Sequence, residues 1–153
     1  MPQIIYREAD EADYATGAQL RFEMAREMGS HDFVDTSTDW RDRFVEYFSR
    51  KHRIDEARLF LAYDGDLPVG SAIVSILEEY RRYVLGVQSA WVNAVYVKPE
   101  YRRMGIAKEL MLLTIDWARQ HGCRRMRLRS SDEGRPMYAS LGFHPTSEME
   151  FPL

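Results

Sequence analysis

Residues 95–110, VYVKPEYRRMGIAKEL, change character three times and constrain the fold more than any other stretch of the chain. Alternating apolar residues predict a strand, Pro-Glu-Tyr predicts a turn, and two arginines then lead through Gly105 into an amphipathic helix. The first turn of a helix has backbone N–H groups without an intrahelical partner, and the aligned peptide dipoles add partial positive charge there. Gly105 and the small Ala107 leave room for a bulky ligand, and Arg102, Arg103 and Lys108 add mobile positive charge around it. We therefore expect a phosphate group to bind at this helix start.

Two common nucleotide-binding loops do not match this stretch. No Gly-Lys-Ser/Thr follows, as a Walker loop requires, and the dinucleotide fingerprint Gly-x-Gly-x-x-Gly is absent. A helix start in which Gly105 allows close packing and the arginines lie on the surface is an open alternative from these residues alone.

The composition narrows the class of protein. A length of 153 residues fits one domain that spans 1–153, and a net charge of -3 lacks the basic excess of general nucleic-acid binders. The single Cys123 excludes an internal disulfide framework, and no cluster of Cys and His offers a metal site. Residues 1–14 are acidic and have no apolar core, which argues against a signal peptide or membrane helix. We expect a cytoplasmic protein without nucleic-acid or membrane partners.

Hydrophobic periodicity predicts alternating strands and helices along the chain. Helices are expected at 11–28, from about 38 to beyond Phe48, at 105–120 and at 135–141. The helix at 105–120 would place one apolar stripe on one side, made of Ile106, Leu110, Leu113 and Trp117. The stretch 58–76 reads as two antiparallel strands joined at Asp64-Gly65, a dipeptide that tolerates a tight hairpin. Further strands are expected at 3–7, 89–97, 123–130 and 148–153. The pattern predicts an α+β fold with a mixed sheet flanked by helices.

Two motifs resemble those of the GNAT superfamily of acyl-CoA-dependent N-acyltransferases. Arg102-x-x-Gly105-x-Ala107 is similar to that family's Arg/Gln-x-x-Gly-x-Gly/Ala signature, and the strand and turn before it look like the family's. Tyr138-Ala-Ser-Leu-Gly142-Phe143 resembles the family's Tyr-x-x-x-Gly-Phe. The order of predicted elements agrees with the GNAT fold, a mostly antiparallel central sheet, over essentially the whole chain. The resemblance implies an N-acetyltransferase that uses acetyl-CoA and a small-molecule or peptide amine.

The resemblance also implies a coenzyme A site. We call the phosphate-binding helix start the cradle. In GNAT enzymes the strand before the cradle splays from its neighbour, and the backbone groups of this strand pair with the pantetheine arm of coenzyme A. Ser131 stands where many relatives carry an Asn that contacts the cofactor, which leaves that contact in doubt. The pyrophosphate would lie on the amides at the helix start. The implied cofactor-binding residues are Val95, Val97, Arg102, Arg103, Met104, Gly105, Ile106, Ala107, Lys108 and Ser131.

The implied reaction is direct attack of an amine on the thioester. The oxyanion needs a donor such as the backbone N–H near Val95, and the departing thiolate needs a proton, for which the resemblance implies Tyr138. No covalent enzyme intermediate is required, which fits a chain in which Cys123 reads as a small buried strand residue.

The sequence does not show which residue acts as the general base. Many GNAT enzymes place a Glu on the central strand, but a period-two reading gives a face without any base, made of Ser89, Trp91, Asn93, Val95 and Val97. Our hypothesis is that Asn93 and Ser89 hold a water chain that ends at Glu78 or Glu79. An equally weighted alternative is that Asn93 only satisfies backbone groups where the strands splay. His31 and Asp32, in the loop after the first helix, are the next candidates.

The acceptor is open at this point: aminoglycosides, polyamines, amino acids and protein N-termini all fit. The first two helices carry a Met and aromatic stripe that is expected to form core on one side and in part to wall the acceptor pocket: Phe22, Met24, Met28, Trp40, Phe44 and Phe48. A catalytically weak acyl-CoA sensor, or an unrelated nucleotide binder, is an alternative to the enzyme. The sequence also leaves open whether the protein forms a homodimer.

Overall fold

The computed structural model describes residues 1–29 and 39–153. Its strands form one sheet in the order β1-β2-β3-β4-β5. All neighbouring strands are antiparallel except β4 and β5, which run parallel. The predicted α+β class with a mixed, mostly antiparallel sheet is therefore confirmed. The bounds are β1 Ile4–Glu8, β2 Ala57–Asp64, β3 Leu67–Ile76, β4 Gln88–Val97 and β5 Cys123–Arg127.

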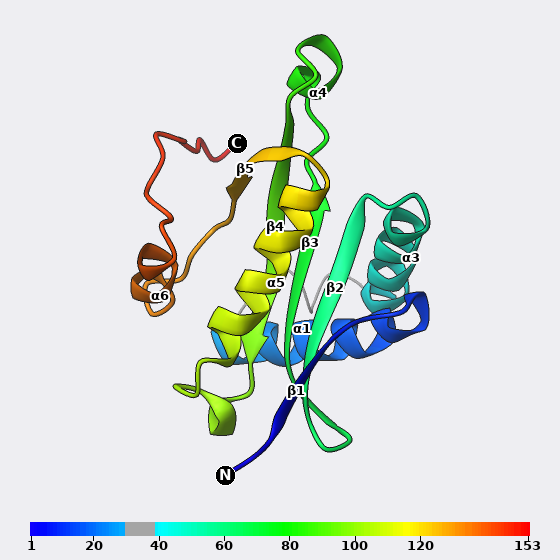
Figure 1. The fold of residues 1–153 in the computed structure, drawn as a ribbon, viewed down its shortest axis with the longest axis vertical. Coiled ribbons are helices and arrows are strands. Elements are labelled where there is room, and N and C mark those ends of the chain that lie inside the picture. The colour runs from blue at the N-terminus through cyan, green and yellow to red at the C-terminus, as the bar shows by residue number, and fades with distance from the viewer. Residues whose placement is uncertain (30–38) are drawn as a thin grey trace.

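Helices cover both faces of the sheet, as Figure 1 shows: α5 lies on one face, and α1 and α3 lie on the other. The long helices are α1 Tyr14–Met28, α3 Trp40–Arg53 and α5 Ile106–Gln120. The shorter ones are η1 Glu11–Asp13, α4 Tyr80–Val84, η2 Pro99–Tyr101 and α6 Arg135–Ser140. Each predicted helix is present, and α4 is an addition that the sequence did not suggest because none of its residues is buried.

The face under α5 holds a dry core. The predicted stripe of α5 is confirmed, since Ile106, Leu110 and Trp117 are buried against strands β2 to β4. Gly70 on β3 allows this close approach, because a Cβ at Gly70 would lie 3.2 Å from a side-chain carbon of Ile106. The start of α5 is thus fixed against the sheet.

The face under α1 and α3 is only partly closed. Tyr14 and Leu20 of α1 are buried against the strands, as is Phe48 of α3. Met24 and Phe44 are only half-buried. The aromatic stripe therefore serves both as core and as the wall of a cavity described below.

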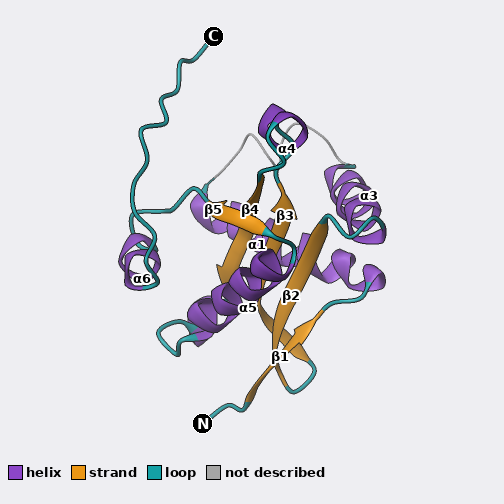
Figure 2. Cartoon of the chain, turned by 45° about the horizontal axis from the view of Figure 1, so that its top comes forward, coloured by secondary structure: helices purple, strands orange, loops and turns teal. Residues whose placement is uncertain are grey.

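The prediction of a C-terminal strand at 148–153 is wrong. Residues 143–153 have no regular structure and extend away from the sheet, as Figure 2 shows, and Met149, Phe151 and Leu153 are exposed. Their alternation is typical of a strand, but a strand also needs a neighbour whose backbone it can pair with. The predicted strand at 123–130 ends early, at Arg127, because the chain diverges there from β4 and makes no further pairs with it.

Within residues 1–29 and 39–153, none of the helices has both the length and the apolarity needed to span a bilayer.

Candidate active site

β4 and β5 pair over only part of β4, and the open side of β4 beyond that pairing is called the cleft below. Their pairing runs from Gln88 opposite Cys123 to Trp91 opposite Arg127. Beyond Trp91, β4 continues to Val97 with no β5 partner in the described part of the chain. The backbone from Val92 onward is therefore free on that side to bond an extended ligand, as predicted for Val95 and Val97.

A bulge lies at the mouth of this cleft. Ala94 has φ 54°, a left-handed conformation that is unusual for a residue other than glycine. The pairing of β3 with β4 shifts here, from Ile73 opposite Asn93 to Ser71 opposite Tyr96. The Ser71 hydroxyl donates to the Ala94 carbonyl at 3.1 Å and holds the bulge.

The bulge corrects the period-two reading of β4. Asn93 and Ala94 both face the α1 and α3 side, where they line a cavity. Val95 and Val97 pack instead with the core under α5. One extra residue on the strand reverses the alternation, so the predicted face from Ser89 to Val97 is not a single face. The prediction for Val95 and Val97 concerns their backbone groups, which do not depend on the face that their side chains occupy.

The predicted cradle has the geometry of an anion site. Arg103 and Gly105 have φ 61° and 79°, and this left-handed turn leads directly into α5 at Ile106. The first backbone bond of the helix runs from the Glu109 N–H to the Gly105 carbonyl at 3.1 Å, and no side chain of the described residues caps the helix start. The amides of Ile106, Ala107 and Lys108 therefore keep donors for a ligand. Gly105 is required for its φ, since a Cβ there would meet open space.

Arg102 plays a different part from the one expected for its side chain. Its guanidinium contacts both carboxylate oxygens of Glu27 at 2.6 Å, and its Nε donates to the Val97 carbonyl at 3.0 Å. It therefore joins the end of α1 to the end of β4 and does not add mobile charge at the cradle mouth. Arg103, Met104 and Lys108 are exposed at the start of α5, where the phosphate site is predicted.

Tyr138 lies on α6, which follows β5. The residue is 9% exposed and belongs to the core under α5, and its ring packs edge-on against Phe143 with the ring centroids 5.8 Å apart. Burial raises the pKa of its phenol, so the group stays protonated and able to donate. Its hydroxyl has no hydrogen-bond partner among the described residues. The Ser131 hydroxyl accepts a bond from the Gly134 N–H at 3.1 Å, which leaves its own proton for a ligand.

The predicted water-chain residues are held in two separate bonds. The Trp91 indole N–H donates to the Asn93 side-chain oxygen at 3.0 Å. Ser89 is buried, with 1% of the residue exposed, and its hydroxyl donates to Glu79 at 3.2 Å. Glu78 instead accepts from the Tyr83 hydroxyl at 2.7 Å and pairs with Arg82. The structure thus links Ser89 to Glu79 and not to Glu78.

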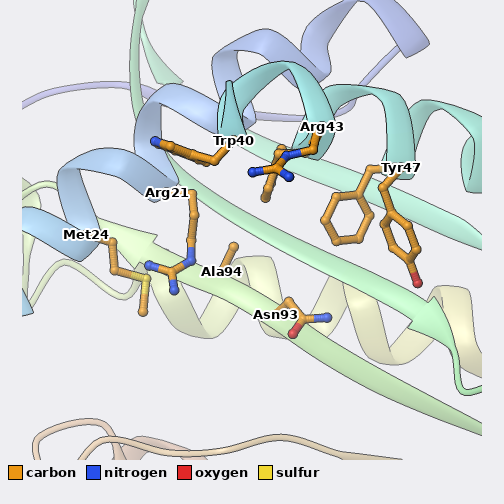
Figure 3. Close-up of a pocket in the computed structure, with 9 residues that line it drawn as sticks. Arg21, Met24, Trp40, Arg43, Tyr47, Asn93 and Ala94 are labelled. Atoms are coloured by element: carbon orange, nitrogen blue, oxygen red, sulfur yellow. The ribbon is translucent and has the colours of Figure 1, made fainter. Parts of the chain in front are cut away.

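A cavity of about 540 Å³ lies between α1, α3 and the bulge of β4, as Figure 3 shows. Its floor is Asn93 and Ala94. Its walls are mostly apolar or aromatic: Met24, Trp40, Phe44, Tyr47 and Phe48. Two arginines, Arg21 of α1 and Arg43 of α3, also line it. Sequence reasoning missed these two. Their helical spacing could have indicated them, because Arg21 precedes Met24 by three residues and Arg43 precedes Tyr47 by four.

The histidines within the described ranges have structural partners or lie apart from the cavity. His52 bonds the Tyr14 hydroxyl at 3.1 Å, and His121 bonds Asp55 at 2.9 Å. His144 is exposed near the C-terminus. His31 and Asp32, the next candidates for a base, lie outside the described residues.

Comparison with known proteins identifies the class. The family model of the acetyltransferase (GNAT) family matches residues 22–143. The aminoglycoside N(6')-acetyltransferase type 1 of Acinetobacter baumannii is 33% identical over 113 residues, which cover 69% of this chain and 73% of that protein. The glucosamine 6-phosphate N-acetyltransferase of Trypanosoma brucei brucei is 35% identical over 75 residues, 49% of this chain and 50% of that protein.

A solved structure shows the same fold. The predicted acetyltransferase from Clostridium acetobutylicum, crystallised with acetyl-CoA, superposes with a TM-score of 0.83 at 20% identity and covers 99% of this chain and 96% of that one. The chain therefore belongs to the GNAT family of acetyltransferases. It is an N-acetyltransferase that uses acetyl-CoA, and the family match excludes an unrelated nucleotide binder.

Proposed function

We propose that this protein transfers an acetyl group from acetyl-CoA to the primary amine of a small molecule bound in the cavity between α1 and α3. One observation carries this proposal: the cavity floor at Asn93 and Ala94 lies at the bulge of β4, where β5 has diverged. An acceptor in the cavity and a donor in the cleft would therefore approach the same point of one strand from two sides. That arrangement suits direct attack with both substrates bound.

The residues present fit the donor. The free backbone of Val95 and Val97 would hold the pantetheine arm, and the open amides of Ile106 to Lys108 would hold the pyrophosphate. The Ser131 hydroxyl would add a donor on the far side of the cleft. Acetyl-CoA supplies the activated acyl group as a thioester.

The chain's own groups would handle the developing charges. A backbone N–H at the bulge, near Val95, donates to the thioester oxygen as negative charge develops there. The Tyr138 phenol, kept protonated by burial, donates a proton to the sulfur as the thiolate departs.

The amine must lose its proton before it attacks. Among the described residues no carboxylate or imidazole lines the cavity. Asn93 would orient a water at the amine, and the proton would leave along water toward Ser89 and Glu79. The Trp91 indole lies between the two ends and can only donate, so the water path must pass around it.

We also propose that the protein is cytoplasmic and forms a homodimer. The free thiol of Cys123 suits a reducing compartment. The exposed apolar side chains of Met149, Phe151 and Leu153 offer a surface that a second copy could cover. Light scattering of the purified protein would test the dimer, with a monomer mass as the contrary result.

Thiol release with a panel of amines tests the activity. Acetyl-CoA and enzyme are mixed with each amine, and free coenzyme A is measured against an amine-free blank. We expect release that depends on the amine. A coenzyme A adduct in native mass spectrometry, combined with no amine-dependent release across the panel, would indicate the sensor instead.

A further inference from the structure

β5 forms one edge of the sheet. In the described part of the chain it pairs with β4 alone, so its other side keeps backbone N–H and C=O groups that no strand uses. A groove of about 450 Å³ lies along β5, which we call the β5 groove. One side of this groove is Arg125, Met126 and Arg127 of the strand, and the other side is Leu141 to His144 with Thr146. An open edge of this kind can accept another extended segment.

The two faces of β5 differ in chemistry. Met126 and, just beyond the strand, Leu128 pack against the core under α5. Because side chains alternate along a strand, Arg125 and Arg127 point to the opposite face. Within residues 1–29 and 39–153, no acidic side chain pairs with these two arginines. The edge therefore offers apolar contacts on one face and positive charge on the other.

The end of the chain has the matching pattern. Residues 147–153, SEMEFPL, are called the tail here, and its acidic residues alternate with apolar ones: Glu148 and Glu150 with Met149, Phe151 and Leu153. An extended tail would thus have one acidic face and one apolar face. Figure 2 shows the tail leading away from the sheet, and all of its side chains are exposed. A sheet edge would remove the apolar ones from water.

The two patterns can be aligned residue by residue. A parallel and an antiparallel register both bring the apolar residues of the tail beside Met126 and Leu128, and both place Glu150 opposite Arg127. Opposite charges at facing positions of neighbouring strands stabilise the pair. Pro152 is compatible with this placement, since proline occurs in strands at the edge of a sheet.

The tail is poorly placed to enter the groove of its own chain. The side of the groove that faces β5 ends at Thr146, directly before the tail, so the chain would have to reverse tightly there. Tight reversals use Gly, Asn or Asp in a left-handed conformation, and residues 145–150, PTSEME, contain none of these. A tail that comes from a second copy needs no such reversal.

We propose that the tail of one copy adds as an edge strand to β5 of a second copy, and the reverse, so that exchange of tails forms the homodimer. This inference rests on the homodimer proposed above and is independent of acetyl transfer. A two-fold axis repeats the contact and closes the assembly at two copies.

A disulfide across the contact tests the exchange. Neighbouring strands lie about 4.7–4.9 Å apart, which is within the Cα distance range of a disulfide. Arg127→Cys and Glu150→Cys are combined in a Cys123→Ala background, and the oxidised protein is run on a denaturing gel without reductant. We expect a covalent dimer. Arg119→Cys with Glu150→Cys is the control and should stay monomeric on the gel, because Arg119 is exposed on α5 and does not line the groove.

Charge reversal tests the facing pair. Arg127→Glu and Glu150→Arg should each raise the Kd of the dimer about tenfold, since a symmetric dimer contains the contact twice. The double variant exchanges the two charges and should recover most of this loss. Arg119→Glu makes the same change away from the groove and should leave the Kd unchanged. Light scattering over a concentration series measures each Kd, and a chain that ends at Thr146 should be a monomer.

Each contrary result has a different meaning. A cross-linked product of single mass would mean that the tail pairs with β5 of its own chain. A dimer that persists in the chain ending at Thr146, or a parent of dimer mass whose cysteine variant does not cross-link, would place the interface elsewhere. A monomer mass for the parent would overturn the homodimer together with the inference, and amine-dependent thiol release would still support the acetyltransferase.

Discussion

The indole of Trp91 fixes the orientation of Asn93. The Nε1–H group of Trp91 donates to the Asn93 oxygen at 3.0 Å, and because an indole nitrogen cannot accept, the Asn93 atom that it meets must be the carbonyl oxygen. The amide nitrogen of Asn93 is therefore left to face the cavity that Asn93 lines. Asn93 presents an N–H donor there. This donor can bind a water or an oxygen atom of the substrate, but it cannot take a proton from the amine.

Asn93→Ala should lower kcat by about 10- to 100-fold and leave acetyl-CoA binding nearly unchanged, because the amide orients the acceptor side only. Trp91→Phe keeps an aromatic ring but removes the N–H donor, so it should show a smaller loss of kcat in the same direction. Steady-state kinetics and calorimetry measure the two effects. If Asn93→Ala lowers the melting temperature without changing kcat, the alternative, a purely structural Asn93, is correct.

Gly105→Glu should greatly weaken acetyl-CoA binding. The substitution places a negative charge at a helix start whose amides bind the pyrophosphate, and it strains a residue with φ 79° by about 1–2 kcal/mol. Gly105→Gln has the same strain and size without the charge, so the difference between the two variants isolates electrostatics. Calorimetry with folded protein measures both. Equal affinity of Gly105→Glu and the parent would show that the cradle is wrongly assigned.

Tyr138→Phe should lower kcat by about ten- to a thousandfold with acetyl-CoA affinity retained. Its hydroxyl has no partner among the described residues, and the Phe ring can keep the edge-on contact with Phe143. Stability should therefore change little. Activity and thermal melting are measured on the same preparation. A sharp fall of the melting temperature in step with activity would mean that Tyr138 is a packing residue.

The structure could be predicted best where a local backbone conformation or a regular spacing requires a particular type of residue. Gly65 and Gly105 both adopt positive φ, at 59° and 79°, where the hairpin and the cradle were predicted. The stripe of α5 was readable because Ile106, Leu110 and Trp117 repeat at helical spacing and all are buried. Such features depend on a few neighbouring residues, so a single sequence suffices to predict them.

The features that were missed depend on distant partners. The bulge at Ala94 arises from the register with Ser71 and Ile73, and no glycine marks it. The cavity joins Arg21 and Arg43 only because α1 and α3 pack on the same face of the sheet. The alternation at 148–153 is present in the sequence, but it cannot show whether a neighbouring strand exists.

The pair of Arg102 and Glu27 should make stability depend on acidic pH. The hydrogen bond from Arg102 lowers the pKa of Glu27 from its ordinary value of 4.5. A carboxylate with a depressed pKa in the folded state adds stability above its unfolded pKa and loses it as pH falls toward the folded value. The free energy of unfolding should therefore decline below about pH 4.5, less steeply in Glu27→Gln. Urea titrations between pH 3 and 7 measure this, and identical slopes for the two proteins would be the contrary result.

The last prediction concerns the proton taken from the amine. Ser89 donates to Glu79, whereas Glu78 is engaged by Tyr83 and Arg82, so of these two glutamates Glu79 is the one placed to end a proton path along β4. Successive strand residues rise about 3.3 Å, which places Ser89 about 13 Å from Asn93, so bound water must fill the gap around Trp91.

Glu79→Gln should therefore lower kcat at neutral pH by about tenfold, while the matched Glu78→Gln leaves it unchanged. The pH profile of the parent should keep rising toward alkaline pH. No base beside the amine saturates near neutrality, and burial keeps the pKa of Tyr138 above its ordinary 10.0, so the proton donor is not lost early. Kinetics from pH 6 to 10 with the parent, Glu79→Gln and Asn93→Ala measure the shape. A profile that levels off below pH 7, with the same shape in all three proteins, would exclude the water path and direct the search for a base to His31 and Asp32.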